Sequence, residues 1–389
     1  MRKILLIVII IFVLNFNLSY SVVKAEESSS SDNVDQTFNE LIDGINEEDF
    51  KDLVDEINNL FGEDKSLKDI IILFLTGKLE LNFDTLKNYF LSRLNVFFKF
   101  GGELLLYVIA IGIMFNFLNV ISLKKCDNSL KSTLYFISVA IATVLIFKVI
   151  GNVFSYALDK LSLLTKTTQI VFPVMFSLSG LIGNFGVEQI KPFTVFLSVF
   201  FSSITTSVFM PLLKVETTLT TIGNLSGSIN LDGFKKSISS IYKWLLLLAC
   251  GLFSILIISQ GVVNSQYNGL SVKILKYFTG SIIPIVGGFL SGGMEVLISS
   301  AVLIKNSIGL ISVIYVLLTV GLTGLEILVF SFIVKLLASV CQPILDDKYY
   351  KIVIGITDVF NSVSALLFVS GFIFIITIFF IITATAYVF

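Results

Sequence analysis

The chain contains a series of long apolar segments, and these restrict its fold more than any other feature of the sequence. A helix that crosses a bilayer needs about 20 consecutive apolar residues, and backbone polar groups inside hydrocarbon must be paired within helices or closed barrels. The segments that reach or approach this length are 102–123, 132–154, 170–187, 193–213, 241–263, 281–304, 308–334 and 361–387. The sequence therefore predicts an all-α fold, a polytopic transmembrane helical bundle.

Composition supports a membrane protein and argues against a soluble domain. Hydrophobic residues make up 55% of the chain and charged residues only 14%, whereas soluble domains average about 25% charged residues. A soluble fold could not bury this much apolar surface, because its outer layer must meet water. We expect seven or eight spans within residues 99–389. The number depends on 170–187, which is short and contains Pro173, and on 281–304, which is rich in glycine.

The first 25 residues have the features of a secretory signal peptide. Arg2 and Lys3 form a charged start, residues 4–14 form a short apolar core, and Ala25 ends a small-residue cleavage site. An uncleaved membrane anchor is the alternative, although the apolar core is short for a span. Either arrangement places the residues that follow outside the cytoplasm.

Residues 26–98 form a separate acidic region that we expect to be helical and extracytoplasmic. Its first part, 26–69, holds 15 of the 28 acidic residues of the chain. An apolar stripe at helical spacing runs through this part, and it contains Phe50, Leu53, Ile57 and Phe61. Two interpretations remain open: a solvated helical pair, or a docking surface whose stripe binds a groove on a partner. In the second interpretation these four residues are the candidate partner-binding residues.

The loop after the first span gives an independent indication of orientation. It occupies residues 122–131 and carries Lys124, Lys125 and Lys131. Loops rich in lysine and arginine stay on the cytoplasmic side of a membrane. We therefore expect this loop inside the cell, in agreement with an exported N-terminal region.

Several classes of function lack the residues they need. The chain has no histidine, which is the commonest general base and metal ligand. Its cysteines, Cys126, Cys250 and Cys341, lie far apart, and the sequence contains no glycine-rich nucleotide-binding loop. We therefore expect no catalytic residues, no cofactor, no metal site and no nucleic acid partner, and an intramembrane enzyme is disfavoured.

The densest group of unusual residues lies between 264 and 309. Pro284 removes a helical hydrogen bond, and the glycines beside it lower the cost of unwinding. Interrupted helices in bilayers line protein-enclosed or water-filled sites, whereas the alternative is a kinked helix whose glycines only allow close packing. A carboxylate within a span usually faces a partner or a cavity. The candidate conduit residues are Lys273, Lys276, Pro284, Gly287, Gly288, Glu295, Lys305, Asn306, Gly309 and Glu326.

Three short motifs in the same half of the chain carry a family resemblance. They are Lys273-Ile274-Leu275-Lys276, Ile283-Pro284-Ile285-Val286-Gly287, and Leu303-Ile304-Lys305-Asn306 followed by Gly309. With a signal peptide, a short exported region and a membrane body, the chain resembles the stage III sporulation protein AE family of endospore-forming bacteria. The resemblance covers most of the chain and is sharpest across 264–345.

The resemblance implies a non-enzymatic membrane component of a secretion-like sporulation channel. Members of the family belong to a mother-cell membrane assembly that, with a forespore membrane protein, bridges the membranes around the engulfed forespore and supports late forespore development. The implied partners are the other membrane proteins of the stage III sporulation A operon, indirectly the forespore protein, and the lipid bilayer. The implied location is the mother-cell membrane surrounding the forespore. The alternative function is a stand-alone secondary transporter with a substrate site at 281–304.

Overall fold

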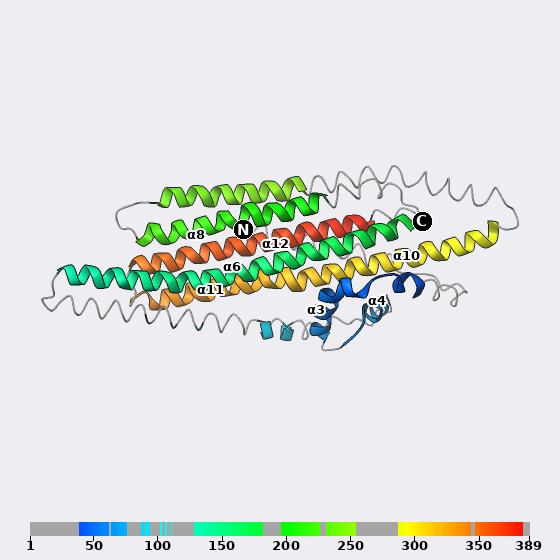
Figure 1. The fold of residues 1–389 in the computed structure, drawn as a ribbon, viewed down its shortest axis with the longest axis horizontal. Helices are drawn as coiled ribbons and strands as arrows, with labels where there is room; N and C mark the ends of the chain where they lie inside the picture. Colours follow the sequence, from blue (N-terminus) through cyan, green and yellow to red (C-terminus); the bar gives the residue numbers. More distant parts are fainter. Residues whose placement is uncertain are drawn as a thin grey trace.

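The fold is an elongated bundle of long helices (Figure 1). The computed structural model describes residues 39–61, 64–75, 87–89, 91–93, 128–181, 196–225, 231–253, 287–343 and 347–383, and the single positions 102, 106 and 110. Every regular element within these residues is a helix or a helical turn. The all-α class predicted from the sequence is therefore confirmed.

Two long rods and several shorter helices make up the bundle. The first rod is α6 (Asn128–Leu181). One helix begins at Phe196 and continues through the π-helical turn η2 (Thr205–Phe209) into α8 (Met210–Leu225), and a further helix spans Asp232–Phe253. The second rod consists of α10 (Gly287–Val316), the π-helical turn η3 (Leu317–Gly321) and α11 (Leu322–Cys341), and α12 (Asp347–Thr383) follows it.

Helices suited to crossing a membrane are present in the described part of the chain. Four of them are long and apolar enough, namely Phe196–Gly223, Asp232–Phe253, Ile298–Cys341 and Tyr350–Ile382. Many of their large apolar side chains are exposed, among them Trp244, Phe332 and Val340. Such side chains are stable in contact with lipid rather than water. These helices make the chain a multi-pass membrane protein.

Two pairs of predicted spans are each a single helix, which corrects the expected boundaries. The segments 132–154 and 170–187 share α6, and the segments 281–304 and 308–334 share the second rod. The polar stretch between the first two does not end α6, because threonine hydroxyls there donate to carbonyls four residues earlier in the same helix. The segment 102–123 lies almost entirely outside the described residues, so the number of crossings stays a prediction.

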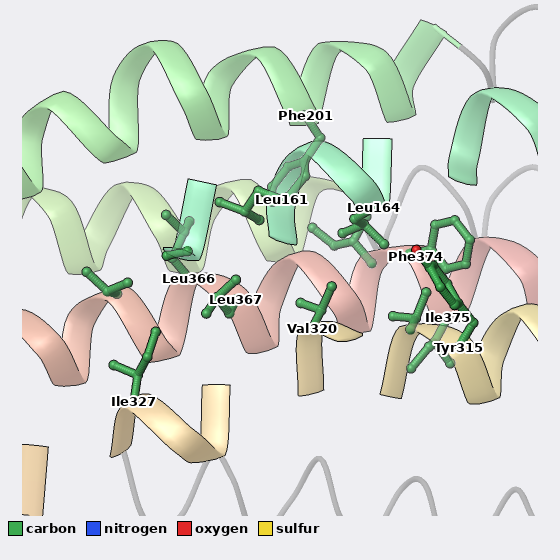
Figure 2. Packing of buried hydrophobic residues seen from close by; sticks show 14 of the residues in the cluster. Leu161, Leu164, Phe201, Tyr315, Val320, Ile327, Leu366, Leu367, Phe374 and Ile375 are labelled. Atoms are coloured by element: carbon green, nitrogen blue, oxygen red, sulfur yellow. The ribbon is translucent and has the colours of Figure 1, made fainter. Parts of the chain in front are cut away.

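Helix α12 lies at the centre of the bundle and packs against α6, α8, α10 and α11. Figure 2 shows its side chains, such as Leu366 and Phe374, facing the neighbouring helices. The ring of Phe374 stacks on that of Phe172 in α6 with 5.5 Å between their centroids. At Gly309 in α10 an added Cβ would lie 2.7 Å from an atom of Ile382, so the glycine permits close approach of α10 and α12.

Three short N-terminal helices lie against the side of the second rod (Figure 1). They are η1 (Glu47–Phe50), α3 (Lys51–Phe61) and α4 (Leu67–Leu75). Ser66 caps α4, because its hydroxyl accepts the Asp69 N–H at 3.2 Å and donates to the Asp69 carboxylate at 2.7 Å. The second of these bonds lowers the pKa of Asp69 below its ordinary value. We call η1, α3 and α4 the head.

The apolar stripe of the head is buried within the chain itself. Phe50, Leu53 and Ile57 are each at most 4% exposed and belong to the same hydrophobic core as the bundle, while Phe61 packs at its margin. The stripe is helical and buried, as its spacing predicts. It is not free to receive a partner's groove, and this corrects the expectation of a docking surface, because α10 already covers it.

Candidate functional site

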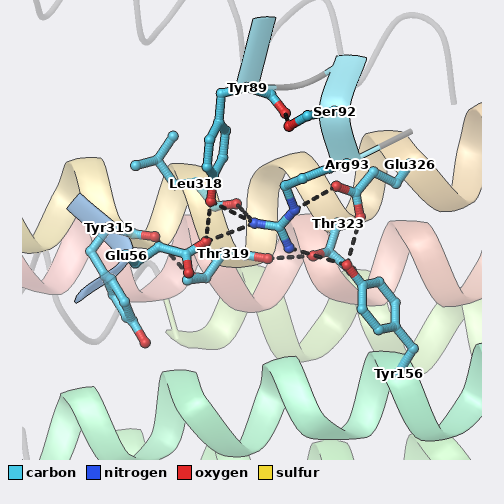
Figure 3. A network of polar contacts seen from close by, with 10 residues as sticks. All are labelled: Glu56, Tyr89, Ser92, Arg93, Tyr156, Tyr315, Leu318, Thr319, Thr323 and Glu326. Carbon is cyan, nitrogen blue, oxygen red and sulfur yellow. Dashed lines mark hydrogen bonds and ion pairs between the residues drawn. The ribbon is translucent and has the colours of Figure 1, made fainter. Parts of the chain in front are cut away.

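The described residues contain a buried polar network where the head meets the bundle (Figure 3). Arg93 lies at its centre, in the short helical segment 91–93. Its Nε lies 2.8 Å from Glu326 Oε1, its Nη1 lies 2.7 Å from Glu56 Oε1, and its Nη2 donates to the Tyr156 hydroxyl at 3.1 Å. Glu56 belongs to α3, Tyr156 to α6 and Glu326 to α11. One guanidinium group therefore connects three helices that are far apart in the sequence.

The carboxylate of Glu326 is fully enclosed by this arrangement. Its side chain has 0% exposure, and its second oxygen, Oε2, accepts a hydrogen bond from the Tyr156 hydroxyl at 2.8 Å. An isolated charge at such a position would lose several kcal/mol of hydration, about 3–5 kcal/mol when one partner of a buried pair is removed. Here both carboxylate oxygens have partners, so the charge can be retained.

The head side of the network is arranged around Glu56. The Tyr89 hydroxyl donates a short hydrogen bond to Glu56 Oε1, and Arg93 Nη1 donates to the same hydroxyl at 3.0 Å. The Arg93 guanidinium carbon also lies 5.5 Å from the centre of the Tyr89 ring, within the range of a cation–π contact. Segment 87–93 is thus held both to α3 and to the bundle.

The π-helical turn η3 supplies a backbone acceptor to the network. The Leu318 carbonyl lies 3.4 Å from Arg93 Nη1. A π-helical turn alters the regular pairing of backbone groups, and such turns are frequent at functional positions. The second rod therefore contributes both a side chain, Glu326, and a main-chain oxygen from the turn that precedes α11.

The charges in the network are fixed over the physiological range of pH. Burial alone would lower the pKa of Arg93, but the negative charge of Glu326 outweighs it and raises the pKa above its ordinary value. Burial and the hydrogen bond to Glu56 raise the pKa of Tyr89, so its phenol stays protonated. The arrangement is therefore suited to holding elements together and not to proton transfer.

Lys305, a predicted conduit residue, closes the end of α12. It lies in α10 with 0% exposure, and its Nζ donates to the carbonyls of Ile381 at 3.1 Å and Ile382 at 3.4 Å. These carbonyls belong to the last turn of α12, where helical carbonyls lack partners within the helix and the helix dipole favours a positive charge. The buried amine is thus explained by contacts within the bundle.

The remaining predicted residues are placed as follows. Helix α10 is continuous from Gly287 through Gly288 to Gly309 and beyond, which corrects the expectation of an interruption across this part of 281–309. Asn306 is partly buried beside Lys305. Lys273, Lys276, Pro284 and the side chain of Glu295 lie outside the described residues, so their roles stay predictions.

The two carboxylates singled out in the sequence, Glu295 and Glu326, do not share a site. Both lie on the second rod, about 45 Å apart along its axis at 1.5 Å per residue. Glu326 has instead the partners described above, which the sequence analysis did not find. One signal was available: Arg93 is one of only two arginines in the chain, and the other is Arg2. Arginine is favoured over lysine where several acceptors are bound in fixed geometry.

Comparison with known proteins places this network within a family. Residues 65–385, which include Arg93, Tyr156, Lys305 and Glu326, match the family described as stage III sporulation protein AE. The chain belongs to this family. The curated stage III sporulation protein AE of Bacillus subtilis (strain 168) is 22% identical over 193 residues, which cover 49% of this chain and 48% of that protein. The chain thus spans about half the length of this curated relative in the match. No solved structure matches the fold.

The family membership confirms the resemblance inferred from the sequence and makes the chain a sporulation protein. The match begins at residue 65, after α3, and runs through the whole bundle. Glu56 therefore lies outside the matched range, whereas its partner Arg93 lies within it. Within the network, the pairing of Arg93 with Glu326 is the part that belongs to the family region.

Proposed function

We propose that this protein is a non-enzymatic membrane component of a channel complex that links the mother cell and the forespore during sporulation. The observation that carries the proposal is the match of residues 65–385 to the stage III sporulation protein AE family. Four helices able to cross a membrane support a place within the membrane. The proposed location is the mother-cell membrane around the forespore.

The structure suggests how such a component would work as a platform. The head and the bundle share one core and are joined by the Arg93–Glu326 ion pair. A partner that contacts the head would therefore transmit force to the membrane helices. The proposed partners are the other membrane proteins of the stage III sporulation A operon and, through them, the forespore membrane protein.

Affinity purification of the full-length chain from sporulating cells tests this proposal. We expect the other membrane proteins encoded in the same operon to be recovered with it, and not with an equally abundant unrelated membrane protein that carries the same tag. Deletion of the gene should abolish heat-resistant spores without changing vegetative growth. Recovery of the chain alone, together with normal spore counts, would show that it does not serve such a complex.

The alternative of a stand-alone transporter with a site at 281–304 gains no specific support. The part of that segment that the structure describes, from Gly287 onward, is a continuous helix. Reconstitution of the purified chain in liposomes separates the two functions. A platform subunit alone should move no solute, whereas a transporter should give saturable uptake without partners.

A further inference from the structure

A small cavity lies between three helices, away from the Arg93 network. It has a volume of about 30 Å³ and is bounded by α6, by the helix that starts at Phe196, and by α12. Figure 2 shows four of its apolar wall residues, Leu161, Leu164, Phe201 and Phe374. The volume suits one water-sized ligand. None of the residues that line it is charged.

The polar part of the wall consists of hydroxyl groups whose hydrogens are already used. Thr165, Thr168 and Thr205 each donate to the backbone carbonyl four residues earlier in their own helix, at 2.8–2.9 Å. A hydroxyl has one hydrogen and two lone pairs. Each of these threonines therefore offers the cavity an acceptor and no donor.

Ser202 follows the same logic. Its Oγ lies 2.5 Å from the Thr165 hydroxyl oxygen. Because the hydrogen of Thr165 points to a carbonyl, Ser202 must be the donor in this contact. Its own lone pairs are then left for other partners. Four hydroxyl oxygens of the wall thus act as acceptors.

Ser370 is the observation that indicates a ligand. It lies on α12, is 4% exposed, lines the cavity, and its Oγ has no hydrogen-bond partner among the described residues. A buried hydroxyl without a partner costs about 1–3 kcal/mol. A ligand in the cavity would remove this cost.

The geometry points to a binding site for one monovalent cation of about the size of Na⁺. A wall of acceptor oxygens repels anions and attracts positive charge. Ca²⁺ and Mg²⁺ are bound through carboxylates, and none lines this cavity. Neutral oxygens alone hold monovalent cations in channel filters, and transporters hold Na⁺ between helices near the bilayer midplane. The half-buried Ser202 and the exposed Val199 place one side of the cavity at the edge of the bundle, where an ion can enter.

Equilibrium binding of ²²Na⁺ to the purified full-length chain tests this site. We compare the wild type with Thr205→Val and Ser370→Ala, each of which removes one cavity oxygen. Thr206→Val is the matched control, because Thr206 is adjacent on the same helix, is exposed, and donates to backbone carbonyls without lining the cavity. Loss of one ligand oxygen should weaken binding by about tenfold, equivalent to 1.4 kcal/mol. Choline, which is too large for the cavity, should not compete.

The outcomes separate a cation from a buried water. Saturable binding that weakens in Thr205→Val and Ser370→Ala but not in Thr206→Val supports the site. Absence of saturable binding to the wild type, or binding that is equal in all four proteins, overturns it and leaves a buried water as the only occupant. Size-exclusion profiles identify any variant that fails to fold, and the conservative Ser370→Ala then decides. The result does not depend on the sporulation channel, because binding is measured on the isolated chain.

Discussion

Arg93 shows how a single side chain can determine the arrangement of elements that are distant in the sequence. It contacts Glu56, Tyr156 and Glu326 within 3.1 Å. A lysine has one ammonium group and could not reach three acceptors in these directions, whereas the planar guanidinium can. The position therefore requires arginine specifically, and not positive charge alone.

Replacing Arg93 by alanine should release the head from the bundle. Glu326 would remain as a buried charge without its cation, at a cost of about 3–5 kcal/mol. We expect a lower thermal midpoint and faster cleavage by an added protease between the head and α6. Both are measured on the purified full-length protein. The double variant Arg93→Ala with Glu326→Leu should recover part of the loss, because it removes the unpaired charge.

The ion pair between Lys68 and Asp43 provides a matched control within the head. Its atoms are 3.1 Å apart, but the side chains are 32% and 66% exposed. Exposed pairs contribute about 0–1 kcal/mol. Lys68→Ala should therefore leave protease resistance unchanged. If it were as damaging as Arg93→Ala, burial would not be the reason for the strength of the network.

Lys305 and Glu326 illustrate how far residue-level prediction could go. Both were identified from the rule that charges within apolar segments have partners or line cavities, and both are fully buried with partners. The partners themselves could not be found. Two are backbone carbonyls of α12, and one is an arginine in a short segment far away in the sequence, and neither leaves a local pattern.

At the scale of elements, helix packing depends on a few glycines. At Gly355 in α12 an added Cβ would collide with Thr220 Cγ2 of α8. The side chain of Thr220 is branched and buried, and its hydroxyl is bound to the Glu216 carbonyl, so it cannot move aside easily. The contact between α8 and α12 therefore requires a residue without a side chain.

Gly355→Ala should destabilise the bundle by about 1–3 kcal/mol through overpacking. Gly151→Ala on α6 is the matched control, because an added Cβ there meets nothing within 4 Å. The control should gain up to about 1 kcal/mol from the higher helix propensity of alanine. Thermal unfolding of both variants in the same detergent measures the difference. Equal effects of opposite expectation, with both stabilised, would show that α8 and α12 do not approach this closely.

The existence of helices could be predicted from the sequence better than their ends. The spacing of Leu53 and Ile57 correctly predicted a buried face, but an amphipathic stripe does not say which element covers it. Pro173 was read as a weakness in a span, yet α6 continues through it. Neighbouring helices and side-chain hydroxyls can satisfy the backbone groups that a proline frees, and the Ser177 hydroxyl bonds the Pro173 carbonyl at 2.8 Å.

At the scale of the whole molecule, the rods are longer than a membrane is thick. The 54 residues of α6 extend about 80 Å, compared with about 30 Å for the hydrocarbon core. The head lies beside the second rod near Tyr315 and Glu326, and its α3 exposes Asp52 and Asp55. These carboxylates need water, so we expect the bilayer to surround the bundle to one side of the head and the rods to extend beyond it.

The length of η3 can be tested independently of its side chains. Deleting Leu317, which is 40% exposed, removes one residue while losing little packing. A normal α-helical turn would then rotate α11 by about 100° relative to α10. Glu326 would leave Arg93, and the head should become as protease-sensitive as in Arg93→Ala. Leu317→Ala, which keeps the chain length, should retain resistance. Equal resistance of the two would show that the turn does not orient α11.

The π-helical turn thus sets the rotational phase of the second rod. Lys305, before the turn, faces the end of α12, and Glu326, after it, faces α6 and Arg93. Two charges on one continuous helix can address different neighbours only if the residues between them add up to the right angle. Among related chains, an insertion or deletion of one residue between these two positions would therefore be more disruptive than most substitutions there. The segment carries information in its count of residues as well as in their identity.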